Sequence, residues 1–374
     1  MGLTFAVISG QIFAEDLNSI AAPKFLGSQS CSSSSCHGGA GEKSNQYTIW
    51  STHDFHHVRP YATLETARSE RLADVLKIGN ATQSARCTVC HAPFQTVPAA
   101  RLGAEAKVTE GISCETCHGP AENWIRSHTR PDYTHADRVA TGMRDLKNHY
   151  VRANTCVACH QNIDPEIRAA GHPELIFEMD GQSVTMPRHW PKAQDAPGPQ
   201  AWLVGQAVAL REASWQLMNE KSPDEDLINR WRGLAFVIAR AAAVVPDLPA
   251  PPDTTFRPNT ETFQLTQKWG EEIAKGAARL SWTDELSKKV LNAFSESAAD
   301  FGSIPKTVSA RRAERLVLAL DRLTAALPQV NSAANQSLNK LFADAQSLPD
   351  FDPQQFAKDL NTFHSSVAGF VETK

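Results

Sequence analysis

Cys87-Thr-Val-Cys90-His91 is the first of three five-residue segments that decide the fold of the first half of the chain. The pattern returns as Cys114-Glu-Thr-Cys117-His118 and as Cys156-Val-Ala-Cys159-His160. Two thiols three positions apart reach the two vinyl groups on one side of a porphyrin as thioethers, and the adjacent His then ligates the iron. The three segments therefore predict covalently attached haem c.

A fourth segment, Cys31-Ser-Ser-Ser-Ser-Cys36-His37, has the same ends with two more residues between its thiols. Small serines allow the extra residues to bulge out. Taken alone, this segment also fits a flexible loop with a disulfide or a zinc-binding pair. Disulfides and zinc are the alternatives for all eight cysteines, but neither gives a reason for a His directly after each pair. Beside three regular motifs, the segment predicts a fourth haem.

The composition is that of an ordinary soluble protein. The 374 residues are 41% apolar and 21% charged, and the net charge of −4 gives no reason to expect nucleic acid as a partner. No apolar run reaches the roughly 18 residues that a membrane span needs. The short apolar run from Leu3 to Ala14 resembles a secretory signal, although no Lys or Arg precedes it. The alternative is a frayed amphipathic N-terminus.

The two halves of the chain differ in character. From Ser28 to about residue 190, turn formers and Cys/His clusters prevail, and few long periodic segments are present to build a core, so haems would fill it. We predict a mainly α fold, with a possible signal peptide and tail at 1–27 and a tetrahaem cytochrome domain with little regular strand at 28–190. A linker at 191–200 and an α-helical domain at 201–374 would follow.

Hydrophobic residues recur at helical spacing in the second half. We expect helix pairs over 201–220 with 224–245 and over 260–280 with 283–299, then a helix over 309–327. Asp352-Pro353 is an N-cap followed by proline at the first helical position, which predicts the start of a last helix.

Nine histidines remain besides the four that follow the cysteine pairs. They are His53, His56, His57, His128, His135, His149, His172, His189 and His364. Haem iron takes a sixth ligand, and His is the candidate because the five methionines are in no obvious ligand setting. A histidine taken at random is most often a surface or capped residue. All except His364 lie in the half that holds the cysteines, which favours ligation.

Two further stretches resemble a known family. Gly111-Ile-Ser-Cys-Glu-Thr-Cys-His-Gly-Pro-Ala-Glu-Asn-Trp124, followed by His128, and Ala169-Ala-Gly-His172-Pro with the later Pro187-Arg-His189-Trp190, are similar to the multihaem cytochromes of the cytochrome c-554 family. The resemblance covers about residues 28–205 and continues weakly beyond. Some longer relatives carry another Cys-x-x-Cys-His among their helices. This chain has none there, so its helical half looks like a support.

The resemblance implies closely stacked haem pairs with mostly two His ligands per iron, one iron sometimes lacking its distal ligand. It maps distal ligands onto His57, which fits the family's His-x-Arg-x-Tyr pattern, and onto His128 and His172. These would serve the haems at His118, His160 and His37, in that order. His53 and His56 are the alternatives to His57. For the haem at His91 two possibilities remain: His189 reaches it, or its sixth position is open.

The leading hypothesis is an exported, periplasmic carrier that passes electrons between redox proteins, and a membrane-bound, quinone-linked protein is one candidate partner. The alternatives are an enzyme acting on a small nitrogen or sulfur compound at an open haem, and a subunit of a cytochrome filament or complex. The absence of the Cys-x-x-Cys-Lys site typical of multihaem nitrite reductases disfavours the enzyme, and the long C-terminal half disfavours the filament. Donor, acceptor and oligomeric state are not fixed by the sequence.

Overall fold

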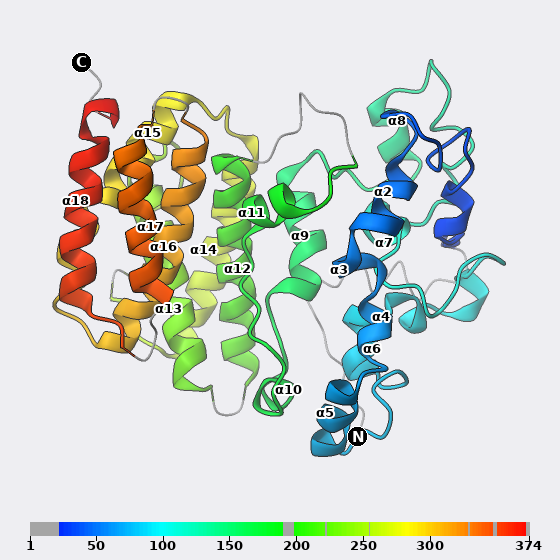
Figure 1. Ribbon diagram of the computed structural model, residues 1–374, viewed down its shortest axis with the longest axis horizontal. Helices are drawn as coiled ribbons and strands as arrows, with labels where there is room; N and C mark the ends of the chain where they lie inside the picture. Colours follow the sequence, from blue (N-terminus) through cyan, green and yellow to red (C-terminus); the bar gives the residue numbers. More distant parts are fainter. Residues whose placement is uncertain are drawn as a thin grey trace. The chain divides into compact units, whose positions relative to one another are not determined.

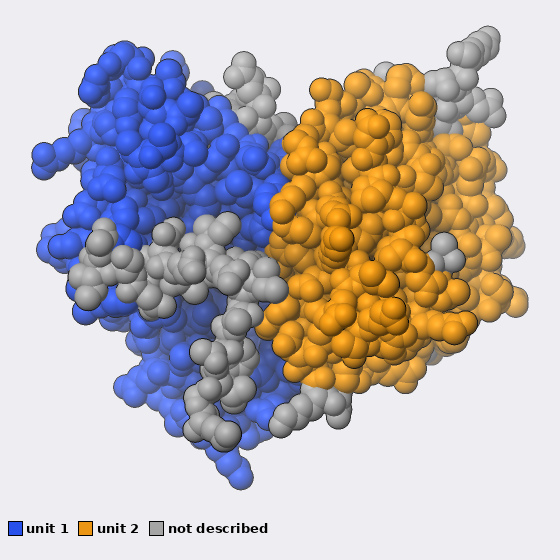
Figure 2. Space-filling model, turned by 180° about the vertical axis from the view of Figure 1, so that it is seen from behind, with its two compact units in different colours: residues 1–175, 184–196 blue, residues 176–183, 197–374 orange. Residues whose placement is uncertain are grey.

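The computed structural model describes residues 22–189, 198–220, 223–253, 255–327, 330–346 and 350–371. The expected signal segment, Trp190 and residues 191–197 of the expected linker lie outside the described residues. Two compact units make up the chain: residues 1–175 with 184–196, and residues 176–183 with 197–374 (Figure 2). We call them the first and the second unit. The second unit includes residues 176–183, which lie before the expected boundary near residue 190.

The first unit consists of short helices joined by loops (Figure 1). They are η1 (Ser28–Cys31), α2 (Gln46–His53), α3 (Phe55–Val58), α4 (Pro60–Thr63), α5 (Ala67–Leu76), α6 (Ala85–His91), η2 (Pro93–Thr96), η3 (Ala99–Arg101), α7 (Cys114–His118), α8 (His135–Ala140), α9 (His149–His160) and α10 (Pro165–Ala169). Among the described residues, this unit has two small hydrophobic clusters, one around Phe25 and Phe94 and one around Leu64 and Ala73. Side chains alone thus supply little of its interior, as expected for a unit filled by cofactors.

The second unit is a bundle of long helices. They are α11 (Met179–Thr185), whose last residues belong to the first unit, α12 (Pro199–Asn219), α13 (Glu225–Val244), α14 (Thr260–Arg279), α15 (Asp284–Ser295), η4 (Ser297–Asp300), α16 (Lys306–Ala325), α17 (Ser332–Gln346) and α18 (Pro353–Val371). Helix α12 packs mainly on α14, and α13 on α16. Every helix expected after residue 200 is present, and α17 is an additional one.

Caps and close packing explain why these helices form where they do. The side chains of Asp224, Asn259 and Thr283 accept hydrogen bonds from the backbone three residues later, at 2.6, 2.8 and 3.2 Å. At Gly233 a Cβ atom would lie 2.6 Å from the carbonyl oxygen of Arg311, so glycine permits α13 to approach α16. The core is large, with Trp202 and many other side chains fully buried.

The fold is mainly α. Within the described ranges no strand is present, and the one extended pairing is an isolated bridge between Phe25 and Leu102. No described helix has the length and apolar character that crossing a bilayer requires.

Candidate haem-binding site

Each of the three regular motifs lies at the end of a helix. Cys87–His91 closes α6, Cys114–His118 makes up α7, and Cys156–His160 closes α9. Residues three and four apart share a helix face, so both thiols and the imidazole of each motif lie on the same side. Local hydrogen bonds start two of these helices: Ser113 N–H donates to Thr116 Oγ1 (3.2 Å), and Tyr150 N–H donates to Asn148 Oδ1 (3.0 Å).

The longer motif reaches a similar closure by a loop. His37 N–H donates to the Cys31 carbonyl at 3.3 Å, while Cys36 N–H donates to Ser33 at 2.9 Å. In a helical Cys-x-x-Cys-His segment, the His N–H also donates to the carbonyl of the first Cys, four residues earlier. The two extra residues are accommodated in an exposed serine loop at 33–35. The segment therefore ends like the regular motifs.

Three of the proximal histidines face a second histidine ring. The ring centres are 6.1 Å apart for His37 and His128, 6.2 Å for His57 and His160, and 6.4 Å for His91 and His172. The ring planes of the first pair are inclined by 18°, those of the other two by 80° and 82°. All six side chains are half-buried.

This separation fits one iron between two imidazoles. With the metal about 2 Å from each ligating nitrogen, and so about 3 Å from each ring centre, two axial rings lie about 6 Å apart. The pairs differ from the assignments that the family resemblance implies. His128 faces His37 rather than His160, His57 faces His160 rather than His118, and His172 faces His91 rather than His37.

Hydrogen bonds at Nδ1 orient the rings. Nδ1 lies 2.8 Å from Gln46 Oε1 in His37, 2.8 Å from Asp54 Oδ2 in His57 and 2.8 Å from the Ile125 carbonyl in His128. Because these oxygens accept, Nδ1 carries the proton and Nε2 keeps its lone pair. A ligating His typically donates its second ring N–H in this way. Trp124 adds an edge-to-face contact with His128, at 5.5 Å between ring centres.

Burial keeps the other imidazoles neutral. It lowers the pKa of His118 to about 4, helped by the neighbouring His189, and it lowers the pKa of His160 to about 4. Burial also lowers the pKa of His189. Neutral rings are the form that binds metal. The charge of His189 thus acts on His118, whereas the expected alternative was the haem at His91.

Other histidines do not share these features. His53 and His56, the alternatives to His57, are exposed. His135 is also exposed, and its Nε2 lies 2.9 Å from Asp145 Oδ1. His364 is in the second unit, where its Nδ1 lies 2.9 Å from Ser295 Oγ.

Thiols of different motifs are neighbours. The Cys31 and Cys114 side chains form a hydrogen bond, which raises the pKa of Cys114, and Cys90 and Cys159 form another, which raises the pKa of Cys159. Burial raises the pKa of Cys156 to about 12, and the nearby Cys117 contributes in the same direction. None of the eight thiols is in a disulfide. The contacts order the motifs as His37, His118, His160, His91.

Three residues that the sequence analysis did not single out support the motifs. Asp54 is 3% exposed and holds His57. Glu115, inside the motif that ends at His118, accepts backbone hydrogen bonds from Leu26, Gly27 and Ala121 at 2.7–2.9 Å. Arg144 donates to the Thr116 and Cys117 carbonyls at 2.6 and 2.8 Å. A carboxylate three residues before a ligand candidate is a signal that could have identified Asp54.

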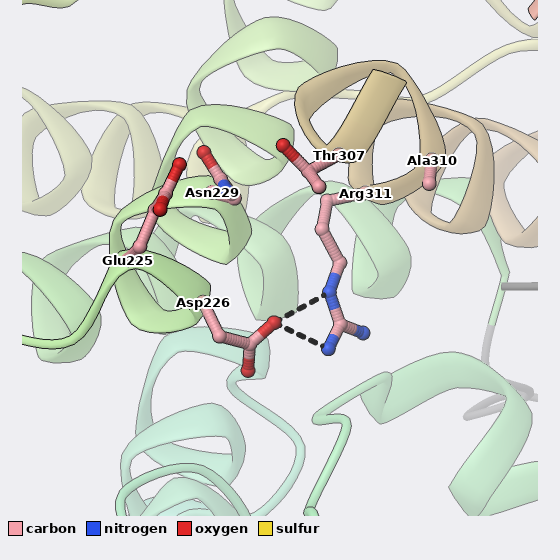
Figure 3. Close-up of a pocket in the computed structure, with 6 residues that line it drawn as sticks. All are labelled: Glu225, Asp226, Asn229, Thr307, Ala310 and Arg311. Atoms are coloured by element: carbon pink, nitrogen blue, oxygen red, sulfur yellow. Dashed lines mark hydrogen bonds and ion pairs between the residues drawn. The ribbon is translucent and has the colours of Figure 1, made fainter. Parts of the chain in front are cut away.

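A pocket in the second unit lies between α13 and α16 (Figure 3). Its lining is Glu225, Asp226, Asn229, Thr307, Ala310 and Arg311. Arg311 points to Asp226 and donates two hydrogen bonds to its Oδ1, at 2.7 and 3.1 Å. The pocket contains none of the cysteine or histidine motifs.

Comparison with known proteins agrees with the chemistry of this donor set. Residues 30–119 match the family of cytochrome c554 and c-prime, and the matched segment contains the motifs ending at His37, His91 and His118. Comparison with the curated proteins and with the solved structures gave no significant match. This match supports a c-type cytochrome that takes part in electron transfer and carries covalently bound haem c, similar over these residues to the cytochrome c554 and c-prime family.

Proposed function

We propose that the chain is a tetrahaem electron carrier that connects redox proteins outside the cytoplasm. Each haem would be attached through one cysteine pair: Cys31 with Cys36, Cys87 with Cys90, Cys114 with Cys117, and Cys156 with Cys159. The following His of each motif would be the proximal ligand. Four cofactors in one unit with little side-chain core of its own suit a relay.

The observation that carries this proposal is the succession of thiol contacts. Cys31 adjoins Cys114, Cys117 is near Cys156, and Cys159 adjoins Cys90. Neighbouring attachment points support a continuous line of haems in the order His37, His118, His160, His91. When bound, each haem supplies a one-electron Fe(III)/Fe(II) couple. A line of such couples passes an electron across the unit without chemistry at any substrate.

Ring pairs support distal ligands for the irons at His37, His160 and His91. We assign His128 to the haem at His37 and His57 to the haem at His160, because their ring centres are 6.1 and 6.2 Å apart. We assign His189 to the haem at His118, whose pKa it lowers as a near neighbour. The fourth assignment, His172, is argued below.

Residues around the motifs would set the reduction potentials. The Asp54 carboxylate accepts the Nδ1 proton of His57, which makes that imidazole a stronger donor to oxidised iron. Arg144 carries a positive charge beside the motifs that end at His118 and His160. The two charges act in opposite directions on neighbouring positions of the relay.

Location and partners follow from the attachment chemistry. Thioethers form outside the cytoplasm on exported apoprotein, so we propose a periplasmic or otherwise exported protein. Its donor and acceptor would be redox proteins, and a membrane-bound protein linked to quinones is a candidate for one of them. Fractionation that found mature holoprotein in the cytoplasm would contradict this.

Mass spectrometry of the denatured holoprotein, made with a c-type maturation system, tests the haem number. Four haem additions are expected, and three would remove the segment ending at His37. Steady-state assays test the role: the protein should be reduced and reoxidised by redox proteins, yet turn over hydroxylamine, nitrite and sulfite negligibly. Sustained turnover that is lost on substitution at His91 would overturn the carrier assignment.

Low-temperature electron paramagnetic resonance of the oxidised protein distinguishes the three neighbouring histidines. His57→Ala should convert one iron from low to high spin without loss of haem, because the thioethers still hold the cofactor. His53→Ala is the matched control and should leave the spectrum unchanged. The reverse result would reassign the ligand within this cluster.

A further inference from the structure

The pair formed by His91 and His172 bears on whether the iron at His91 is open to small molecules. Its ring centres are 6.4 Å apart, close to the 6.1 and 6.2 Å of the other two pairs. We propose that His172 is the sixth ligand of the haem at His91, and that this iron is closed in the resting protein. The inference rests on the proposed haem at Cys87 and Cys90.

Hydrogen bonds leave the correct nitrogen of each ring available. His91 Nδ1 lies 2.9 Å from the Pro60 carbonyl, and His172 Nδ1 lies 2.8 Å from the Pro173 carbonyl. A carbonyl only accepts, so both Nδ1 atoms carry protons and both Nε2 atoms keep lone pairs. The same arrangement holds at His128, whereas exposed His135 uses its Nε2 for Asp145.

Ion pairs and a hydrogen bond hold the segment that carries His172 to the helices around the motif that ends at His91. Arg86, the residue before Cys87, forms ion pairs with Asp164 and Glu166 of the α10 turn, at 2.6 and 2.9 Å. Arg68 of α5 donates to the Gly171 carbonyl at 2.8 Å. These contacts present His172 to His91 without a ligand-induced movement.

Glycine at position 171 is part of this arrangement. Gly171 has a φ of +110°, a conformation that residues with a side chain rarely adopt. It turns the chain directly after α10 so that His172 follows on the side of α5. The placement of His172 is therefore built into the local backbone.

Ring orientation gives the proposal a spectroscopic signature. The planes of His91 and His172 are inclined by 82°, like the 80° of His57 and His160, whereas those of His37 and His128 are inclined by only 18°. Nearly perpendicular axial imidazoles give highly anisotropic low-spin signals, and nearly parallel ones give rhombic low-spin signals. The oxidised protein should contain both types.

The first test uses the unmodified holoprotein. Low-temperature electron paramagnetic resonance of the oxidised form should show no stoichiometric high-spin iron, and the reduced form should bind no carbon monoxide. One high-spin iron per chain, or one carbon monoxide bound per chain, would overturn the proposal. Four haems with one open iron would contradict only this inference, whereas fewer than four haems would contradict the proposed function.

The second test uses substitutions. His172→Ala should make one iron high-spin and allow the reduced protein to bind one carbon monoxide per chain, and added imidazole should restore the low-spin form. His135→Ala is the matched control and should change nothing. If His172→Ala does not accumulate, His172→Met keeps a sixth ligand and should raise one reduction potential. An unchanged spin state in the first variant, or an unchanged potential in the second, would refute the assignment.

Discussion

Asp54 holds the proposed iron ligand His57 and should therefore influence the reduction potential of that haem. It is 3% exposed, and its Oδ2 lies 2.8 Å from Nδ1 of His57. The carboxylate favours positive charge on the imidazole, and on the iron that we propose this imidazole ligates. Asp54→Asn should therefore raise one haem potential by tens of millivolts, measured by spectroelectrochemical titration. Asp132→Asn, at an exposed residue, is the control, and a lowered or unchanged potential in Asp54→Asn would refute the role.

Arg144 should act with the opposite sign. Its guanidinium donates to the Thr116 and Cys117 carbonyls, and its charge counters the raised pKa of Cys156. A positive charge beside an iron favours the reduced form. Arg144→Gln should lower the potentials of the haems at His118 and His160 by tens of millivolts. Arg130→Gln, at an exposed arginine paired with Asp132, should leave all four potentials in place. A rise in Arg144→Gln would contradict the argument.

At the same scale, the sequence indicates the proposed proximal groups directly, but it does not indicate which rings face them. A cysteine pair followed by His indicates haem attachment directly, because the geometry of the cofactor fixes the spacing of the three residues. Which distal ring faces which proximal ring depends on how distant segments fold, and His128 lies 91 residues from His37 in the sequence. Likewise nothing in the local pattern around His172 indicates His91 as its neighbour.

Glu115 joins the motif that ends at His118 to the segment that precedes Cys31. Its carboxylate is 1% exposed and accepts from Leu26, Gly27 and Ala121 N–H at 2.9, 2.7 and 2.7 Å. Glu115→Gln would turn an N–H₂ group toward these donors and leave at least one unsatisfied, at a cost of about 1–3 kcal/mol. The free energy of unfolding should fall by that amount in denaturant titration of the holoprotein. Exposed Glu122→Gln, which loses one contact with Lys24 N–H, should cost less. Equal losses would refute the anchoring role.

The segment at 176–183 should make the stability of the second unit depend on pH. Burial raises the pKa of Glu178 to about 7 and that of Asp180 to about 6. Raised carboxyl pKa values mean that the folded state binds more protons than the unfolded state between about pH 4 and pH 7. Stability should therefore fall as the pH rises through this window. Denaturation of Glu178→Gln/Asp180→Asn should show a weaker dependence, and an unchanged slope would contradict the prediction.

Among the elements, most long helices of the second unit were predictable from their hydrophobic periodicity, including α12 and α16, whose first residues lack a side-chain cap, whereas short helices were not. Residue types that favour the N-cap position precede four of these helices, and the structure has helix starts there: Asp224, Asn259, Thr283 and Asp352-Pro353. Helix α17 was missed, although Leu338 and Leu341 are buried at helical spacing within it. Helices as short as α3 and α4 depend on their surroundings, because one turn is unstable alone.

The whole molecule combines a unit that depends on its cofactors with one that has a core of its own. Within the described ranges, the fully buried large side chains lie mostly in the second unit, Trp202 and Trp231 among them. Among the residues of the first unit that the structure describes, two small hydrophobic clusters are present. Apoprotein made without haem attachment should therefore retain the second unit and lose the first. The sequence predicted this contrast through the cysteine-free half, but it could not assign residues 176–183.

The last prediction concerns residues 176–183. They belong to the second unit, although the rest of that unit begins only at residue 197. Phe177 and Met179 are buried, and the Phe177 carbonyl accepts from Gln206 and Arg315, both at 3.1 Å. Burying a Phe or Met side chain contributes about 1.5–3 kcal/mol each. A polypeptide of residues 174–374 should fold without haem and be several kcal/mol more stable than one of residues 198–374. Urea denaturation followed by circular dichroism measures the difference. Equal stability would show that the segment is dispensable, and failure of both polypeptides to fold would refute an independent second core.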